Sequence, residues 1–139
     1  MKNDFFFKKE KLAKDQFVSL KNAVDHLSFN EKGLIAVITQ DANTKDVLMQ
    51  AWMNKVAIYK TIRTGKMTYW SRSRNQYWVK GETSGHFQKL TSMRFDCDGD
   101  AILCLVEQTG AACHTGRKDC FYFEVNPEKD SVIITSSTP

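Results

Sequence analysis

Long apolar runs are missing from this chain. No apolar stretch in its 139 residues approaches the roughly 20 residues that a membrane-spanning helix needs. The three phenylalanines at positions 5–7 are followed directly by charged residues at 8–10, and this apolar segment is too short for a signal-peptide core. We therefore expect a cytoplasmic protein with no membrane partner.

A strong excess of one charge is also missing. Twenty Lys and Arg against sixteen Asp and Glu leave a net charge of +4, which suits a small phosphorylated substrate but does not argue for nucleic acid. Internal repeats and linkers are absent, so the length indicates one domain. With 42% hydrophobic and 26% charged residues, the composition is that of an ordinary globular protein.

The residue pattern predicts a mainly β fold, with α+β as the runner-up. Strands are expected at 34–39, 46–53, 67–71, 77–80, 89–95, 101–108 and 120–125. The nearly continuous apolar run at 101–108 should lie in the middle of a sheet. Two helices are expected, an amphipathic one at 12–27 and a short one between the N-cap Asn54 and Gly65. Mixed or antiparallel sheets should form a barrel-like or sandwich core.

The chain is expected to divide into three segments. Residues 1–30 form an N-terminal helical extension, and 31–126 form the central domain. Residues 127–139 form a C-terminal tail whose Ser/Thr-rich end should be frayed. The residues suited to chemistry lie in the central segment, so the function is expected there.

Four cysteines in a reducing compartment are more often free, metal-bound or catalytic than disulfide-bonded. Cys97, Cys113 and Cys120 lie in polar surroundings, where thiolates suit zinc, although buried apolar cysteines are the ordinary alternative. Cys104 lies in an apolar run and is expected in the core. The first three are therefore the candidate zinc ligands.

Cys97 is interleaved with Asp96, Asp98 and Asp100. In an extended segment the three carboxylates would share one face and the thiol would take the other. Carboxylates suit a hard cation such as magnesium. A calcium loop is disfavoured because Ala101 stands where such a loop requires glycine, and a purely structural acidic turn is the other alternative.

Basic and hydroxyl side chains follow in the segments 71–74 and 80–86. Arg72, Arg74 and Lys80 could neutralise phosphate, although basic residues beside turns are usually solvated surface. His114 follows Cys113 directly and could be a ligand or a base, and His86 could act in the same way. Trp70 and Trp78 could stack on a base or simply pack.

Together these segments closely resemble the phosphoribosyl-AMP cyclohydrolase family, which opens the purine ring in histidine biosynthesis. The matching stretches are Asp46-Val-Leu-Met-Gln-Ala-Trp-Met-Asn54, Tyr69-Trp-Ser-Arg-Ser-Arg74, Lys80-Gly-Glu-Thr-Ser-Gly-His86, Asp96-Cys-Asp-Gly-Asp-Ala101, Ala112-Cys-His-Thr-Gly116 and Cys120-Phe-Tyr122. The resemblance covers about residues 34–122. Because the chain stops soon after the last motif, the resemblance implies the single-activity form.

The resemblance also implies the cofactors and the assembly. Zinc is expected on Cys97, Cys113 and Cys120 and magnesium on the Asp triplet. The zinc site is expected to be shared across an intertwined homodimer, with Cys97 from one chain and the other two cysteines from its partner. The implied reaction is attack of water on C6 of 1-(5-phosphoribosyl)-AMP, followed by cleavage of the N1–C6 bond.

A charge argument adds a base to this site. Three thiolates on Zn²⁺ leave a net charge of −1 and acidify water poorly, so a base should assist; His114 is the first choice, with His86 and Glu82 in reserve. Arg72, Arg74, Lys80 and Ser84 are the expected substrate contacts. The alternative is a non-enzymatic, zinc-stabilised nucleotide- or nucleic-acid-binding module in which His114 closes the zinc site. A redox role is disfavoured because the spacing of Cys113 and Cys120 is not Cys-x-x-Cys.

Overall fold

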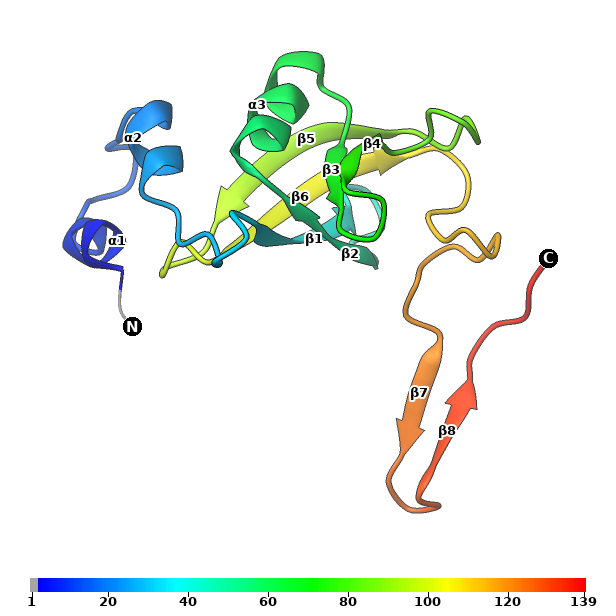
Figure 1. The fold of residues 1–139 in the computed structure, drawn as a ribbon. Helices are drawn as coiled ribbons and strands as arrows, with labels where there is room; N and C mark the ends of the chain where they lie inside the picture. The colour runs from blue at the N-terminus through cyan, green and yellow to red at the C-terminus, as the bar shows by residue number, and fades with distance from the viewer. Residues whose placement is uncertain (1–2) are drawn as a thin grey trace.

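The computed structural model describes residues 3–139, and this part of the chain forms three short helices and eight strands (Figure 1). The helices are α1 (Asp4–Lys9), α2 (Leu20–Asp25) and α3 (Lys55–Thr64). The strands are β1 (Ile35–Asp41), β2 (Val47–Met53), β3 (Thr68–Ser71), β4 (Gln76–Val79), β5 (Gln88–Phe95), β6 (Ala101–Gln108), β7 (Phe123–Asn126) and β8 (Ser131–Ile134). The prediction of a mainly β fold is confirmed.

Four strands form the central sheet in the order β2-β1-β6-β5. β1 pairs antiparallel with β2 and parallel with β6, and β5 pairs antiparallel with β6. The apolar strand β6 therefore lies inside the sheet, as predicted. In the described part of the chain β2 and β5 are the two edges of this sheet and do not pair with each other. The expected barrel-like core is thus wrong in that no closed barrel forms.

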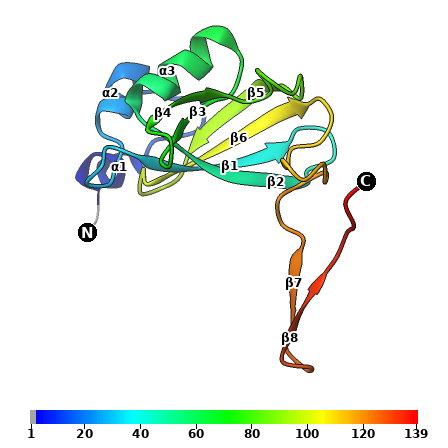
Figure 2. The same cartoon turned by 45° about the vertical axis from the view of Figure 1, so that its right-hand side comes forward.

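The core lies between the sheet and a layer made of α3 and the β3–β4 hairpin (Figures 1 and 2). Alternate residues of β1, Ile35 and Val37, are buried in this core. Tyr69 of β3 is fully buried, and its hydroxyl donates to Gln88 Oε1 at 2.6 Å and lies 2.7 Å from Thr39 Oγ1. This polar contact holds β3 against both β1 and β5 inside an otherwise apolar core.

Helix α3 forms as its flanking residues predict. Asn54 accepts a hydrogen bond from Ala57 N at 2.8 Å, and Gly65 ends the helix with a φ of 74°. The Thr61 hydroxyl donates to Thr68 O at 3.2 Å, and this contact attaches α3 to β3. These caps fix where the helix begins and ends, while the packing against the sheet stabilises it.

The helix expected at 12–27 is wrong. Helices form at Asp4–Lys9 and Leu20–Asp25 instead, and Ser19 caps the second by accepting from Asn22 N at 3.1 Å. Phe17, one of the apolar residues that suggested the long helix, is 89% exposed. An apolar stripe stabilises a helix only where something covers it, and the first part of this one, Leu12, Phe17 and Leu20, is exposed. Residues 3–139 therefore form three short helices where two were expected.

An ion-pair group attaches α2 to α3. Asp25 accepts hydrogen bonds from Lys21 Nζ at 2.5 Å and Lys55 Nζ at 3.0 Å. These two bonds, Lys21's first, lower the pKa of Asp25 to about 2. The N-terminal segment is thereby joined to the core layer by charge as well as by the buried Val24 and Leu27.

The C-terminal segment 127–139, which we expected to be only a tail, contains the strand β8, whereas its Ser/Thr-rich end, 135–139, forms no helix or strand. β7 and β8 pair antiparallel into a hairpin, with Phe123 opposite Ile134 and Val125 opposite Val132. The hairpin extends away from the sheet on the side opposite α3 (Figures 1 and 2). It spans the expected boundary between residues 126 and 127; the division of the chain into three segments stays a prediction. Across residues 3–139, no helix has the length and apolar character to cross a bilayer.

Candidate metal centre and substrate pocket

Cys113 and Cys120 lie side by side in the loop that follows β6. Their thiols are hydrogen-bonded to each other, and the Thr115 hydroxyl donates to Cys113 Sγ at 3.1 Å. Cys113 N donates to Arg117 O at 3.2 Å, which makes the loop turn tightly, and Cys120 N donates to Leu48 O at 2.8 Å, which attaches it to β2. Two of the three predicted zinc ligands therefore meet within one chain.

The two thiols differ in acidity. Burial raises the pKa of Cys113, but the hydrogen bonds from Thr115 and Cys120 and the charge of Arg117 outweigh it and lower that pKa. Burial and the neighbouring charge of Cys113 raise the pKa of Cys120 to about 11. Cys113 is thus the more acidic thiol, and a second negative charge beside it is disfavoured. A soft divalent cation would remove that penalty.

Lys80 lies beside this thiol pair rather than at the surface. Its side chain is only 9% exposed, its Nζ donates to Ala112 O, and burial lowers its pKa while the charges of Cys120 and Cys113 oppose this effect. The predicted phosphate contact of Lys80 stays a prediction. In the structure its ammonium group binds Ala112 O and lies over the Trp78 ring, near enough to the cysteines to interact with their charge.

A pocket of about 550 Å³ opens beside Cys113. Seven of the residues predicted to act in metal binding, catalysis or substrate binding line it: Arg74, Lys80, Glu82, Ser84, His86, Cys113 and His114. They come from four separate parts of the chain: the turn before β4, the end of β4, the loop before β5, and the loop after β6. The fold thus brings the basic, acidic, imidazole and thiol groups to a single cavity.

The His86 ring is held in a defined orientation within this pocket. Its Nδ1 lies 3.2 Å from Ala111 O, so the neutral ring donates from Nδ1 and keeps Nε2 as an acceptor. Gly110, at φ +69°, packs directly against this ring, so a Cβ at position 110 would lie only 2.6 Å from His86 Cδ2. His114 is exposed at the pocket lining. Both imidazoles can therefore reach a ligand in the pocket.

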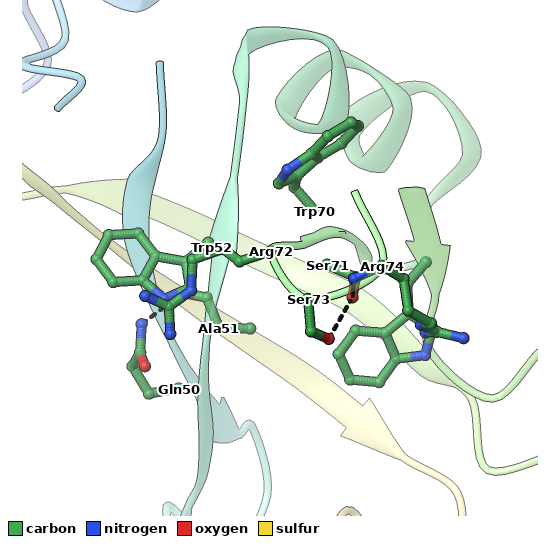
Figure 3. A pocket seen from close by; sticks show the side chains of 9 residues that line it. Gln50, Ala51, Trp52, Trp70, Ser71, Arg72, Ser73 and Arg74 are labelled. Carbon is green, nitrogen blue, oxygen red and sulfur yellow. Dashed lines mark hydrogen bonds between the residues drawn. The ribbon is translucent and has the colours of Figure 1, made fainter. Parts of the chain in front are cut away.

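A second pocket, of about 600 Å³, adjoins the first and shares Arg74 and Trp78 with it (Figure 3). It is lined by three tryptophans and by the Ser-Arg-Ser-Arg turn between β3 and β4: Gln50, Ala51, Trp52, Trp70, Ser71, Arg72, Ser73, Arg74 and Trp78. The Arg72 guanidinium lies 4.9 Å over the Trp52 ring. Flat aromatic faces beside guanidinium and hydroxyl groups suit a nucleotide with a phosphate.

Asp96, Asp98 and Asp100 lie in the turn between β5 and β6. The segment is a tight turn and not the extended stretch that we expected, because Asp96 Oδ1 accepts from Asp100 N at 2.9 Å and Gly99 adopts φ +64°. The carboxyls of Asp96 and Asp100 are hydrogen-bonded to each other. That bond, burial and the charges of Asp96 and Asp98 raise the pKa of Asp100. For Asp96 burial raises the pKa, but hydrogen bonds from Asp100 and the turn amides outweigh it and lower the pKa.

Cys97 lies exposed in the same turn, far from the other two cysteines. The eight-residue strand β6 separates the two ends, a span of about 26 Å at 3.3 Å per residue. Accordingly, residues 3–139 contain no group of three His, Cys, Asp or Glu side chains placed to hold a metal ion. One chain alone assembles neither predicted set of three ligands.

The sequence model of one protein family, described as phosphoribosyl-AMP cyclohydrolase, matches residues 49–122. The chain belongs to the phosphoribosyl-AMP cyclohydrolase family. The match contains both pockets, the three cysteines and the Asp triplet. The segments outside it, 1–48 and 123–139, hold α1, α2, β1 and the β7–β8 hairpin.

Relatives named phosphoribosyl-AMP cyclohydrolase align over most of the chain. The protein of Roseobacter denitrificans is 56% identical over 111 residues, which is 80% of this chain and 87% of the relative. That of Alcanivorax borkumensis is 55% identical over 109 residues, 78% of this chain and 77% of the relative. That of Hyphomonas neptunium is 64% identical over 94 residues, 68% of this chain and 72% of the relative. The resemblance seen in the motifs is therefore confirmed.

Two pocket residues of this cyclohydrolase family member escaped the sequence reasoning. Trp52 and Gln50 line the second pocket, and Trp52 Nε1 is buried without a hydrogen-bond partner among the residues that the structure describes. Strand alternation contained the signal, since Met49 and Met53 are buried on the other face of β2. That β2 runs beside the Ser-Arg-Ser-Arg turn was not evident from the sequence.

Proposed function

We propose that this chain hydrolyses the N1–C6 bond of 1-(5-phosphoribosyl)-AMP, a step of histidine biosynthesis. One observation carries the proposal: in a member of the phosphoribosyl-AMP cyclohydrolase family, a single pocket gathers the Cys113 thiol, two imidazoles, a carboxylate and basic side chains. The aromatic second pocket adjoins it, as a substrate with two ribose phosphate groups requires. The alternative of a non-enzymatic zinc-stabilised module gains no support from any described feature.

The cysteine pair fits zinc. Cys113 and Cys120 lie in hydrogen-bonding contact, and the neighbouring positive charges of Lys80 and Arg117 favour thiolates there. Cys97 of a second copy would complete the set, because Cys97 of the same chain lies at the other end of β6. When bound, zinc supplies a water molecule with a lowered pKa. Because the site depends on two chains, we propose a homodimer.

The Asp turn supplies carboxylates, the ligand type that a hard divalent cation prefers, although the three are not yet arranged around one point. The hydrogen bond with Asp96, burial and the charges of Asp96 and Asp98 raise the pKa of Asp100, so the three carboxyls lie close enough to repel one another when ionised. Magnesium on Asp96, Asp98 and Asp100 would balance that charge and attract the substrate phosphates. Since Cys97 lies within this turn, the two metal sites of the dimer would be neighbours.

Protons are moved by the imidazoles. We assign the uptake of a proton from the attacking water to His114, which is exposed in the pocket directly after Cys113. The water oxygen bonds to C6, the N1–C6 bond breaks, and N1 takes up a proton. The oxygen and both hydrogens of the water are thereby accounted for in the product. Nε2 of His86, held by the Nδ1 contact with Ala111, lies in the same pocket and is available for that second transfer. Glu82 lines the same pocket and is the reserve base.

The basic Ser-Arg-Ser-Arg turn between β3 and β4 orients the substrate. Arg72 and Arg74, with the hydroxyls of Ser71 and Ser73, face the second pocket, and Ser84 faces the first. Guanidinium groups bind phosphate bidentately, so these side chains are suited to hold the two phosphates. We expect the protein to work in the cytoplasm, where reducing conditions keep Cys113 and Cys120 as free thiols.

The test is direct. The purified chain is incubated with phosphoribosyl-AMP, zinc and magnesium, and ring opening is followed by ultraviolet absorbance. A spectrum that changes only with enzyme and metal present supports the proposal. No change with fully zinc-loaded protein would refute it, and unfolding on chelation without any turnover would favour the binding-module alternative.

A further inference from the structure

The N-terminal segment contacts the Asp turn between β5 and β6. Helix α1 lies at the end of the sheet from which this turn emerges (Figures 1 and 2). The Phe6 ring of α1 packs on Gly99, so closely that a Cβ at position 99 would lie 2.5 Å from Phe6 Cε2. Ser28 N donates to Gly99 O at 2.7 Å, and the Ser28 hydroxyl donates to Asp98 O at 3.4 Å. Two separate parts of the N-terminal segment therefore meet on the tip of this turn.

The two parts are connected to each other. Asn3 Oδ1 accepts from Phe6 N at 3.2 Å and so caps α1. Asn3 Nδ2 donates to His26 O at 2.6 Å and to Ser28 Oγ at 2.7 Å. The Phe5 ring stacks on the His26 ring with 4.3 Å between their centroids. A six-residue helix is not stable by itself, so these contacts hold α1 in place. We call this group the N-terminal brace: Asn3, Phe5, Phe6, His26 and Ser28.

The brace covers the backbone of the turn and leaves its carboxylates open. Hydrogen bonds within the turn close its base, where Asp96 Oδ1 accepts from Asp100 N at 2.9 Å and Gly99 N donates to Asp96 O at 3.1 Å. At the tip, Gly99 is buried, whereas Asp98 and Asp100 on either side of it are exposed. The contacts with Phe6 and Ser28 thus restrain the main chain of the tip, while the carboxylates on either side still reach solvent.

We infer that the N-terminal brace positions the Asp turn for a hard divalent cation, by restraining the backbone at Asp98 and Gly99 before the ion binds. This inference rests on the cation site of the proposed function. Ordering one backbone residue on binding weakens an affinity by roughly 10-fold, so a turn that is already ordered binds its ion more tightly. Only the carboxylate side chains then have to move to surround the ion.

The brace is a feature of this chain that the family match does not contain. All of its residues precede the matched segment 49–122, whereas the Asp turn lies inside that segment. The family motifs therefore supply the carboxylates, and a part of the chain outside them holds the turn that carries them.

The test removes the ring that lies over the turn. Phe6→Ala is compared with Phe7→Ala, which makes the same change one residue later in α1, at a side chain that is 46% exposed. The full zinc-loaded chain is titrated with Mn²⁺, a hard divalent cation whose free form is measured by electron paramagnetic resonance. Asp98→Asn should lose the Mn²⁺ binding, which assigns the bound ion to the turn.

We expect the dissociation constant for Mn²⁺ to rise at least about 10-fold in Phe6→Ala and to stay within about 3-fold of wild type in Phe7→Ala. Phe6→Leu keeps an apolar side chain over Gly99 and should restore the affinity to within about 3-fold of wild type. If Phe6→Ala does not fold, Ser28→Ala takes its place, because Ser28 is exposed and only its hydroxyl is lost. That variant should weaken Mn²⁺ binding at least about 3-fold.

Hydrogen exchange on the zinc-loaded chain without Mn²⁺ tests the restraint itself. The amides of Gly99 and Asp100 should exchange at least about 10-fold faster in Phe6→Ala than in wild type, while the amides of β6 keep their wild-type rates. Faster exchange in the turn and in β6 alike would show a general loss of stability and would overturn the positioning role.

The outcomes also separate this inference from the proposed function. A chain whose Mn²⁺ affinity depends on Phe6, but which does not open the purine ring, refutes the function and leaves the brace intact. A chain that opens the ring but binds no Mn²⁺ at the turn overturns the brace and leaves the activity intact. Wild-type affinity in Phe6→Ala, or an equal loss in Phe7→Ala, overturns the brace as well, and so does wild-type affinity in Ser28→Ala where that variant takes the place of Phe6→Ala.

Discussion

Removal of a single oxygen tests the polar contact inside the core. The substitution Tyr69→Phe keeps the aromatic ring and removes the buried hydroxyl group. That hydroxyl donates to Gln88 Oε1 at 2.6 Å, so the Thr39 hydroxyl must be the donor in the 2.7 Å contact with it. Burial raises the pKa of Tyr69, so the group that is lost is a neutral phenol. The variant leaves a buried acceptor on Gln88 and a buried donor on Thr39 without this partner.

The expected magnitude follows from those two groups. An unsatisfied buried donor or acceptor costs about 1–3 kcal/mol, and the two share one site, so the free energy of unfolding should fall by about 2–4 kcal/mol. For a chain of this length, that corresponds to a Tm lower by roughly 6–12 °C. Urea and thermal unfolding followed by circular dichroism, at one fixed protein concentration, measure both quantities.

A matched variant separates the effect of burial from the effect of removing a tyrosine hydroxyl. Tyr77→Phe removes the same oxygen from a half-buried ring whose hydroxyl accepts from Asn54 Nδ2 at 3.1 Å, and it should cost no more than about 1 kcal/mol. If Tyr69→Phe loses less than about 0.5 kcal/mol, or no more than Tyr77→Phe, the argument from buried hydrogen-bond partners is refuted.

Three further predictions concern the site and its scaffold. Cys113→Ala should lose bound zinc and turnover, and near wild-type activity with one zinc per chain would contradict the ligand assignment. Gly110→Ala should lower kcat/KM at least about 10-fold, because the new Cβ would displace His86. Gly85→Ala is the control: Gly85 has a similar positive φ but open space around its Cβ position, so kcat/KM should stay within about 3-fold of wild type. Equal losses in the two variants would show that backbone strain alone lowers the activity. Because the folded-state pKa of Asp25 lies near 2, below its ordinary 3.8, its stabilising contribution should be complete above about pH 4 and disappear as the pH falls toward 2. Asp25→Asn should therefore be less stable than wild type at pH 5, with the gap closing by pH 2 in urea titrations; a gap independent of pH would contradict this.

Local signals in the sequence predicted the central domain well. Asn54 and Gly65 delimit α3 because capping and a left-handed residue are properties of a few neighbouring residues. The run at 101–108 predicted an interior strand because only a strand buried on both faces lacks polar alternation. The same local reasoning failed at residues 12–27 and missed the strand β8 at 131–134. There the outcome depends on whether another surface covers the apolar side chains.

Residue types and order by themselves determined which groups this protein has for chemistry: thiols, carboxylates, imidazoles and guanidinium groups in the spacing of one family. Only the tertiary structure decided which of them meet. It joins Cys113 to Cys120 and places Lys80 against them, because β2 and β6 hold the loop ends. It keeps Cys97 a full strand length away, because the turn before β6 and the loop after it emerge from opposite ends of the sheet. Covalent order does not encode such distances, which arise from the pairing of strands remote in the chain.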